Sequence, residues 1–300
     1  MRPRRRAARR APVRRPVPLS VALVLAGLLG TACGATAPSG PGASSTTTAT
    51  VPTTTGVPTT VPVSTTVALY FLRGPYLGVA HRTLVTGSTP GTSALTALLD
   101  GPTGIEAGAG LSTAVPAGSA LRGLTISGGV ATVDLNGAFA MPGAPESELG
   151  RVAQVVYTLT QFPSVQSVAF EIGGMRPTMF ASGAVSLRRP LGRTDVLAAL
   201  PAILVESPAV GDSLHGSLRL KGLANVFEAQ FNMQLVDADG NVLLDHPVHA
   251  SAGSGTWGTF DVTFPVTVKA PVMTTLRVFD VSAKDGSPMD EIDLHLPAGP

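Results

Sequence analysis

Residues 115–139, VPAGSALRGLTISGGVATVDLNGAF, carry the clearest folding signal in this 300-residue chain. Apolar residues alternate with other residues on both sides of Gly128-Gly129, at Leu124 and Ile126 before the pair and at Ala131, Val133 and Leu135 after it. Such alternation is typical of half-buried strands, and a glycine pair favours the left-handed conformations of a tight turn. The stretch therefore predicts a β-hairpin.

The segments around this hairpin predict helices and further strands. VALYFLR (67–73) and VQSVAFEI (165–172) are strand-like, whereas 145–162 has the apolar spacing of a helix. A second helix is expected over 89–102, capped by Thr92 or Ser93 and ended by Gly101-Pro102. This order predicts an α+β domain over 67–190, with helices lying on a mixed sheet.

Three stretches of this region carry a family resemblance. ALLDGP (97–102), the hairpin stretch and QVVYTLTQFPSVQSVAFEIGG (154–174) resemble the GerMN-type sporulation and spore germination domain. The resemblance covers roughly 67–189. It implies a role in spore germination or in envelope processes, through assembly or ligand recognition.

Residues 201–300 contain seven short strand-like runs and no convincing helix. This pattern predicts an all-β immunoglobulin-like sandwich. Within 226–236, Phe227 and alternate residues to Leu235 are expected on one face, with Glu228 and its alternates on the other. GLANVFEAQF, DADGNVL and VFDVSAKDGSPMDEIDL resemble the immunoglobulin-like domain found beside germination domains. The stretch 188–201 between the domains is expected to be a short helix or a linker.

The N-terminal 32 residues have the composition of a secretory signal. Eight arginines and no acid occupy the first fifteen positions, and a 14-residue apolar run follows at 19–32. GTAC (30–33) is similar to a bacterial lipobox, which implies cleavage before Cys33, the only cysteine, and lipid on its sulfur. The alternative is an ordinary signal beside a free or buried thiol. Residues 33–66, rich in Thr and Pro, are expected to form a tether that begins at the lipidated cysteine.

Removal of the signal changes the charge of the protein. The formal net charge is +2, and loss of eight arginines makes it −6. An acidic chain is a poor nucleic-acid ligand, because such binding depends on clustered Lys and Arg. No nucleic-acid partner is expected. The membrane is expected as a partner through Cys33, on the extracytoplasmic face, together with an envelope protein or a cell-wall glycan.

Asp237–Asn241, DADGN, is the main candidate for a metal loop. An EF-hand requires glycine at its sixth position and Glu at its twelfth, but here glycine is fourth and Val248 is twelfth. A hairpin turn is therefore expected. The alternative is a calcium site shared by sandwich loops, with Asp285, Asp290, Glu291 and Asp293 as a second acidic cluster. His246 and His249, three apart on an expected strand, suit no common metal. No metal site and no cofactor are predicted.

The sequence contains no recognised catalytic motif. It has no G-x-S-x-G, no phosphate-binding loop and no helical H-E-x-x-H, so no catalytic residues are assigned and the protein is not expected to be an enzyme. Its ligand-binding residues are unknown, with Trp257 and Glu228 as weak candidates. Trp257 is expected at a strand start, either at the core edge or as a glycan platform. The sequence predicts a non-catalytic, membrane-anchored lipoprotein with a binding or assembly role in the envelope or in germination. The alternatives are a peptidoglycan-binding protein and an extracellular hydrolase.

Overall fold

The structure is a computed structural model that describes residues 64–85, 89–282 and 284–300. All of these described residues belong to one compact unit. The predicted signal, Cys33 and the tether up to residue 63 lie outside the described residues. In the described part, no helix has the length and apolar character needed to cross a membrane.

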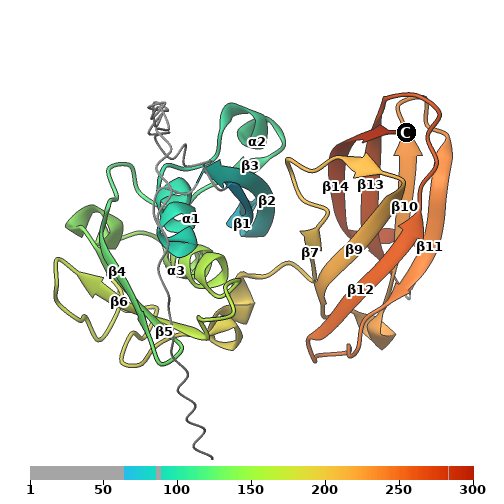
Figure 1. Cartoon of the computed structure of the whole chain (residues 1–300). Coiled ribbons are helices and arrows are strands. Elements are labelled where there is room, and N and C mark those ends of the chain that lie inside the picture. Colours follow the sequence, from blue (N-terminus) through green and yellow to red (C-terminus); the bar gives the residue numbers. More distant parts are fainter. Residues whose placement is uncertain (1–63, 86–88, 283) are drawn as a thin grey trace, which may run out of the picture. The chain divides into compact units, whose positions relative to one another are not determined.

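The first region contains two three-stranded sheets rather than the single mixed sheet predicted (Figure 1). In one sheet, β1 (Ser64–Arg73) pairs antiparallel with β2 (Tyr76–Val85) and β3 (Leu111–Ser112). In the other, β5 (Val130–Leu135) pairs antiparallel with β4 (Leu121–Ser127) and parallel with β6 (Ser167–Ile172). Sequence analysis missed β2, which pairs with β1 along its whole length and gives β1 a sheet of its own. Strand β1 also begins at Ser64, three residues before the expected start of the domain.

The predicted hairpin is confirmed. Ser127 of β4 pairs with Val130 of β5, so Gly128 and Gly129 form a two-residue loop. Their φ angles are +57° and +81°, which side chains other than glycine rarely adopt. The alternating residues of β5 are fully buried, at Ala131, Val133 and Leu135.

Two helices lie between the sheets, α1 (Pro90–Leu99) and α3 (Pro145–Leu159) (Figure 1). The predicted cap of α1 is wrong, because Pro90 occupies its first turn and Thr89 is the N-cap residue. Proline suits the first helical position, because the N–H group that it lacks would have no partner within the helix there. Helix α3 is buried from Gly150 to Leu159.

Arg151 of α3 holds several loops of the first region together. It is buried and donates from Nε to Ala114 O at 2.9 Å and from Nη1 to Phe139 O at 2.6 Å and Met141 O at 2.8 Å. Its guanidinium also lies 5.4 Å from the ring centroid of Phe180. Burial of a cation is tolerated here because the loops supply carbonyl oxygens and ring faces to it.

Short helices complete the first region and lead into the second. Helix α2 (Gly104–Gly108) follows α1, η1 (Gly137–Ala140) precedes α3, and η2 (Arg193–Ala199) lies between the two regions. The stretch at 188–201 therefore includes a short 3-10 helix, one of the two expected forms.

The second region is all β. All seven predicted strands form, namely β7 (Ile203–Ser207), β9 (Ser217–Ala224), β10 (Gln230–Asp237), β11 (Val242–His249), β12 (Gly258–Pro265), β13 (Val272–Val281) and β14 (Pro288–Gly299). The pairing order is β11-β10-β13-β14-β8-β9-β12, and β7 pairs with β9. Strand β8 (Leu214–His215) has only two residues and pairs with both β14 and β9, so it connects β11, β10, β13 and β14 to β9 and β12. Phe231 of β10 packs on Phe260 of β12, with ring centroids 4.9 Å apart.

The alternation predicted for 226–236 holds only from Gln230 onward. Phe231, Met233 and Leu235 are buried, as expected. Phe227 is exposed, because residues 227–229 form the short helix η3 (Phe227–Ala229) instead of a strand. Glu228 and Ala229 have φ angles of +54° and +58°. The polar strand face thus lacks Glu228.

Candidate functional site

The two residues singled out for binding both lie at the loop that precedes β12. Glu228 is exposed, and its backbone N–H donates to Ser254 Oγ at 3.0 Å. Trp257 directly precedes β12 and is half-buried against the core. This location agrees with the core-edge interpretation of Trp257, and binding by either residue stays a prediction.

Asp237–Asn241 forms the predicted turn between β10 and β11. Asp237 Oδ1 accepts the backbone N–H groups of Asp239 and Asn241 at 3.0 and 2.8 Å, and its Oδ2 accepts Asn241 Nδ2 at 2.9 Å. Gly240 takes a φ of +82°. The carboxylate most suited to a cation is therefore used to close the turn.

The second acidic cluster is also engaged in local contacts. Arg277 Nε lies 2.6 Å from Glu291 Oε1 and 3.3 Å from Asp293 Oδ1, while Asp285 accepts bonds from Ser287. His246 stacks on Phe264 at 4.8 Å. Among residues 64–85, 89–282 and 284–300, no group of three or more His, Cys, Asp or Glu side chains could hold a metal ion.

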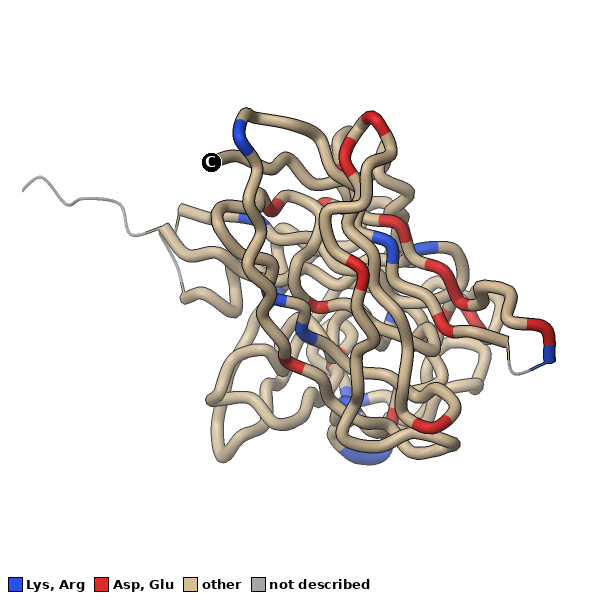
Figure 2. Tube along the Cα trace, turned by 90° about the vertical axis from the view of Figure 1, so that its right-hand side faces the viewer, with Lys and Arg blue, Asp and Glu red and all other residues tan. Residues whose placement is uncertain are grey.

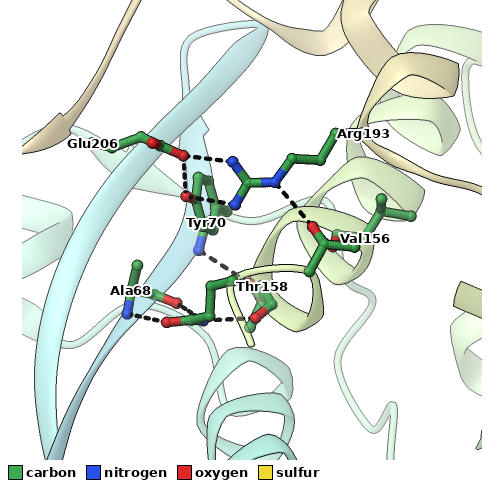
Figure 3. Close-up of polar contacts among 8 residues, drawn as sticks. Ala68, Tyr70, Val156, Thr158, Arg193 and Glu206 are labelled. Carbon is green, nitrogen blue, oxygen red and sulfur yellow. Dashed lines mark hydrogen bonds and ion pairs between the residues drawn. The ribbon is translucent and has the colours of Figure 1, made fainter. Parts of the chain in front are cut away.

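The structure assembles a polar cluster that the sequence analysis did not foresee (Figure 3). Arg193 of η2 donates from Nη1 to Glu206 Oε1 at 2.7 Å, from Nη2 to the Tyr70 hydroxyl at 3.2 Å and from Nε to Thr160 Oγ1 at 3.0 Å. The guanidinium also lies 4.5 Å from the ring centroid of Tyr157. Burial would lower the pKa of Arg193, but Tyr70 and Glu206 outweigh it and raise that pKa. Arg193 therefore stays charged at the junction of β1, α3 and β7.

The end of α3 is joined to β1 beside this cluster. The side chain of Gln161 accepts from Ala68 N at 2.8 Å and donates to Ala68 O at 2.7 Å, and Tyr70 N donates to Thr158 Oγ1 at 3.2 Å (Figure 3). These contacts fix the strand that carries Tyr70.

A second contact links β2 to the loop after β7. His81 Nδ1 lies 2.9 and 2.8 Å from the two carboxylate oxygens of Asp212, and His81 N donates to Val210 O at 2.8 Å. Burial would raise the pKa of Asp212, but hydrogen bonds from His81 and Ala209 N lower it overall. Asp212 thus engages Nδ1 of the His81 imidazole, and Nε2 is the ring nitrogen that lies outside this contact.

Both contacts border one polar cleft of about 510 Å³. Arg193, Glu206, His81, Ser207, Arg219 and Lys221 contribute to its wall. Arg219 is paired with Asp261 at 2.6 Å, whereas Lys221 forms no ion pair in the part of the chain that the structure describes. Ser207 lines the same cleft as His81, but no hydrogen bond joins the two in those residues. The cleft therefore presents charges and hydrogen-bond groups suited to binding.

Sequence analysis missed these residues because their partners are far apart in the chain. Tyr70 and Glu206 are 136 positions apart, and His81 and Asp212 are 131 apart. One usable signal was present: Gly74-Pro75 followed by YLGVAHRTLV indicates a turn and then a strand, which would have placed His81 on β2.

The two regions of the chain differ in formal net charge. Residues 67–190 carry a formal net charge of +1 and residues 191–300 carry −7. Figure 2 shows acidic residues on strands and turns of the second region. That region is therefore suited to cationic rather than anionic partners.

Comparison with known families agrees with the two-part fold. Residues 68–177 match the family described as sporulation and spore germination, and residues 202–287 match the immunoglobulin-like domain of bacterial spore germination. Each match covers less than half of the chain, so the matches show which domain family each of the two regions is similar to. No curated protein matches the chain.

Two solved structures are similar to parts of the chain. One is the first GerMN domain of the sporulation protein GerM from Bacillus subtilis, which is 24% identical with a TM-score of 0.39. The match covers 44% of the present chain and 99% of the solved domain. The tandem GerMN domains of the same protein are 18% identical, with a TM-score of 0.38, and cover 69% of this chain and 63% of that chain.

Proposed function

We propose that this chain is an exported lipoprotein with a non-catalytic binding or assembly role in spore germination or sporulation. The observation that carries the proposal is the pair of adjacent spore germination domain matches, at 68–177 and 202–287. The polar cleft supports binding rather than chemistry, because Arg193 and Glu206 in its wall are paired with each other and, among the described residues, no hydrogen bond joins its Ser207 to His81.

Membrane attachment through Cys33 is the second part of the proposal. The basic start, the apolar run and GTAC support lipidation of Cys33 after cleavage. A diacylglycerol group would hold the protein stably, because two acyl chains bind a membrane far better than one. The folded regions then lie on the extracytoplasmic face and meet an envelope protein partner.

The attachment is tested by fractionation of cells expressing the full chain or the Cys33→Ala variant. We expect the parent in the membrane fraction, with the mass of a lipidated N-terminal cysteine, and the variant outside it. Equal membrane retention of the two would contradict anchoring by this residue.

The binding role is tested in two parallel assays. The purified chain is mixed with protease-stripped cell wall, and cells expressing it are treated with a crosslinker. One dominant crosslinked envelope protein without wall retention supports an assembly role. Retention on the stripped wall would instead indicate glycan recognition and direct attention to Trp257. Loss of germination in a deletion strain, restored by the parent chain, would connect either result to the process.

A further inference from the structure

A cavity of about 200 Å³ lies where the β1–β2 turn meets β7 and β14. Its floor is apolar and includes the buried residues Leu77, Val79, Leu204 and Leu294. Tyr76 lines it too and is 44% exposed. The cavity is distinct from the polar cleft and is smaller than the roughly 300–1,000 Å³ of common small-molecule pockets. Its size suits a single long side chain.

The acidic side of this cavity is built by an irregularity in β14. Val278 of β13 pairs with Ile292, whereas Asp280 pairs with Met289, so Asp290 and Glu291 together stand opposite one residue. This is a β-bulge, a feature that turns side chains away from the regular alternation and is enriched beside functional sites. Asp290 takes a φ of +51°, a left-handed conformation that Asp adopts more readily than most residues. Both Asp290 and Glu291 line the cavity.

Among the described residues, one carboxylate that lines the cavity is not paired with a cation. Glu291 and Asp293 are both paired with Arg277. Arg73, which also lines the cavity, donates from Nη1 to Ala109 O at 2.8 Å and is influenced by the charge of Asp293. Asp290 has no hydrogen-bond or ion-pair partner for its carboxylate among the residues that the structure describes. An occupant that covers Asp290 without supplying a cation would desolvate an unpaired charge, which is costly.

We propose that this cavity receives a lysine or arginine side chain from a basic segment of an extracytoplasmic protein partner. The aliphatic stem packs on Tyr76 and the apolar floor, and the cationic end pairs with Asp290. Long basic side chains bind in this way, with buried methylene groups and a charged tip at the rim. The formal charge of −7 on residues 191–300 favours approach of a basic segment. This inference rests on the proposed function and specifies the chemistry of its protein partner.

The test is a titration of the isotope-labelled full chain in detergent, followed by NMR. The probes are four otherwise identical glycine-serine peptides with a central lysine, arginine, norleucine or glutamate. We expect the lysine and arginine peptides to shift the amide signals of Tyr76, Asp290 and Glu291. The norleucine peptide, which keeps the stem but lacks the charge, should bind about tenfold more weakly, equivalent to about 1.4 kcal/mol.

Two variants of equal charge make the test specific. Asp290→Asn keeps a residue type that tolerates a left-handed backbone and should weaken binding of the lysine peptide about tenfold. Asp239→Asn removes one carboxylate in the β10–β11 turn and should leave binding unchanged. The proposal is overturned if norleucine binds as well as lysine, if the three reporter amides do not shift, or if both variants have the same effect.

A wall component with a free amine offers similar chemistry. Tighter binding of purified amine-bearing muropeptides than of the lysine peptide would overturn the assignment to a protein partner. If the peptides fail while crosslinking finds an envelope partner, only this site is wrong and the proposed function stands.

Discussion

The Arg193 guanidinium lies 2.7 Å from the Glu206 carboxylate, and the Tyr70 hydroxyl donates to the same carboxylate oxygen at 2.5 Å. One oxygen therefore links η2, β7 and β1. Removal of one member leaves a partly buried charge without its partner, whereas removal of both charges is less costly.

Arg193→Met is expected to lower the free energy of unfolding by about 2 kcal/mol, because it leaves Glu206 without its cation. In the Arg193→Met background, Glu206→Gln should cost less than it does in the parent, since the charge it removes is already unpaired. Denaturant unfolding of the parent, both single variants and the double variant measures the coupling. Strictly additive losses would show that the pair contributes nothing jointly.

The two packed tyrosines should respond differently to loss of their hydroxyls. Their ring centroids are 5.2 Å apart, but the Tyr70 hydroxyl has a hydrogen-bond partner, whereas the buried Tyr157 hydroxyl has none among the described residues. Burial, the main cause, raises the pKa of Tyr157 to about 12. Tyr157→Phe should leave stability unchanged or raise it by up to about 1 kcal/mol, while Tyr70→Phe should lower it by about 1–2 kcal/mol. Thermal melting of the two variants checks this, and equal losses would contradict it.

Gly222 on β9 should not tolerate any side chain. A Cβ atom at this position would lie 1.9 Å from Leu204 O on β7. Gly222→Ala is therefore expected to destabilise the second region by about 3 kcal/mol or more, in the range of severe strain and overpacking. Gly104→Ala on α2, where a Cβ meets nothing within 4 Å, serves as the control and should be neutral or slightly stabilising. A similar melting temperature for both variants would contradict the close approach of β7 and β9.

Glu106 should contribute to the pH dependence of stability. Burial would raise the pKa of Glu106, but hydrogen bonds from Arg82 and Thr103 outweigh it and lower that pKa. A carboxyl group whose pKa is lower in the folded state stabilises the fold above its unfolded pKa of about 4.3, and this contribution is lost as the pH falls through the folded value. Glu106→Gln should therefore lower stability at pH 7 and flatten the loss of stability below about pH 4.3. Unfolding curves from pH 7 to pH 3 test this, and an unchanged acid slope would contradict it.

The sequence predicted the strands and turns that depend on a local pattern of residues. Alternation along 130–135 identified β5, and the glycine pair identified its turn, because both signals lie within a few residues. It missed β2, whose Gly78 and His81 interrupt a simple apolar alternation. It also placed Phe227 in a strand, because the apolar period continues across residues 227–229 although the backbone there turns into η3.

Sites that depend on distant residues could not be predicted in this way. Asp237–Asn241 was correctly predicted as a turn because all its hydrogen bonds are local. The Tyr70–Glu206 contact joins residues 136 positions apart, and no periodic signal reports such a distance. The cavity beside Asp290 depends on a bulge, which appears in the sequence as an ordinary run of charged residues.

Arg151 also affects the local dynamics of the first region. Its guanidinium binds carbonyl oxygens from two segments, Ala114 in the loop after β3, and Phe139 and Met141 at η1. Neither segment can open alone without breaking hydrogen bonds to a buried cation. Local fluctuations of the two segments are thereby coupled into one cooperative event, and hydrogen exchange at their amides should proceed through the same opening. A partner that orders one segment would slow exchange in both.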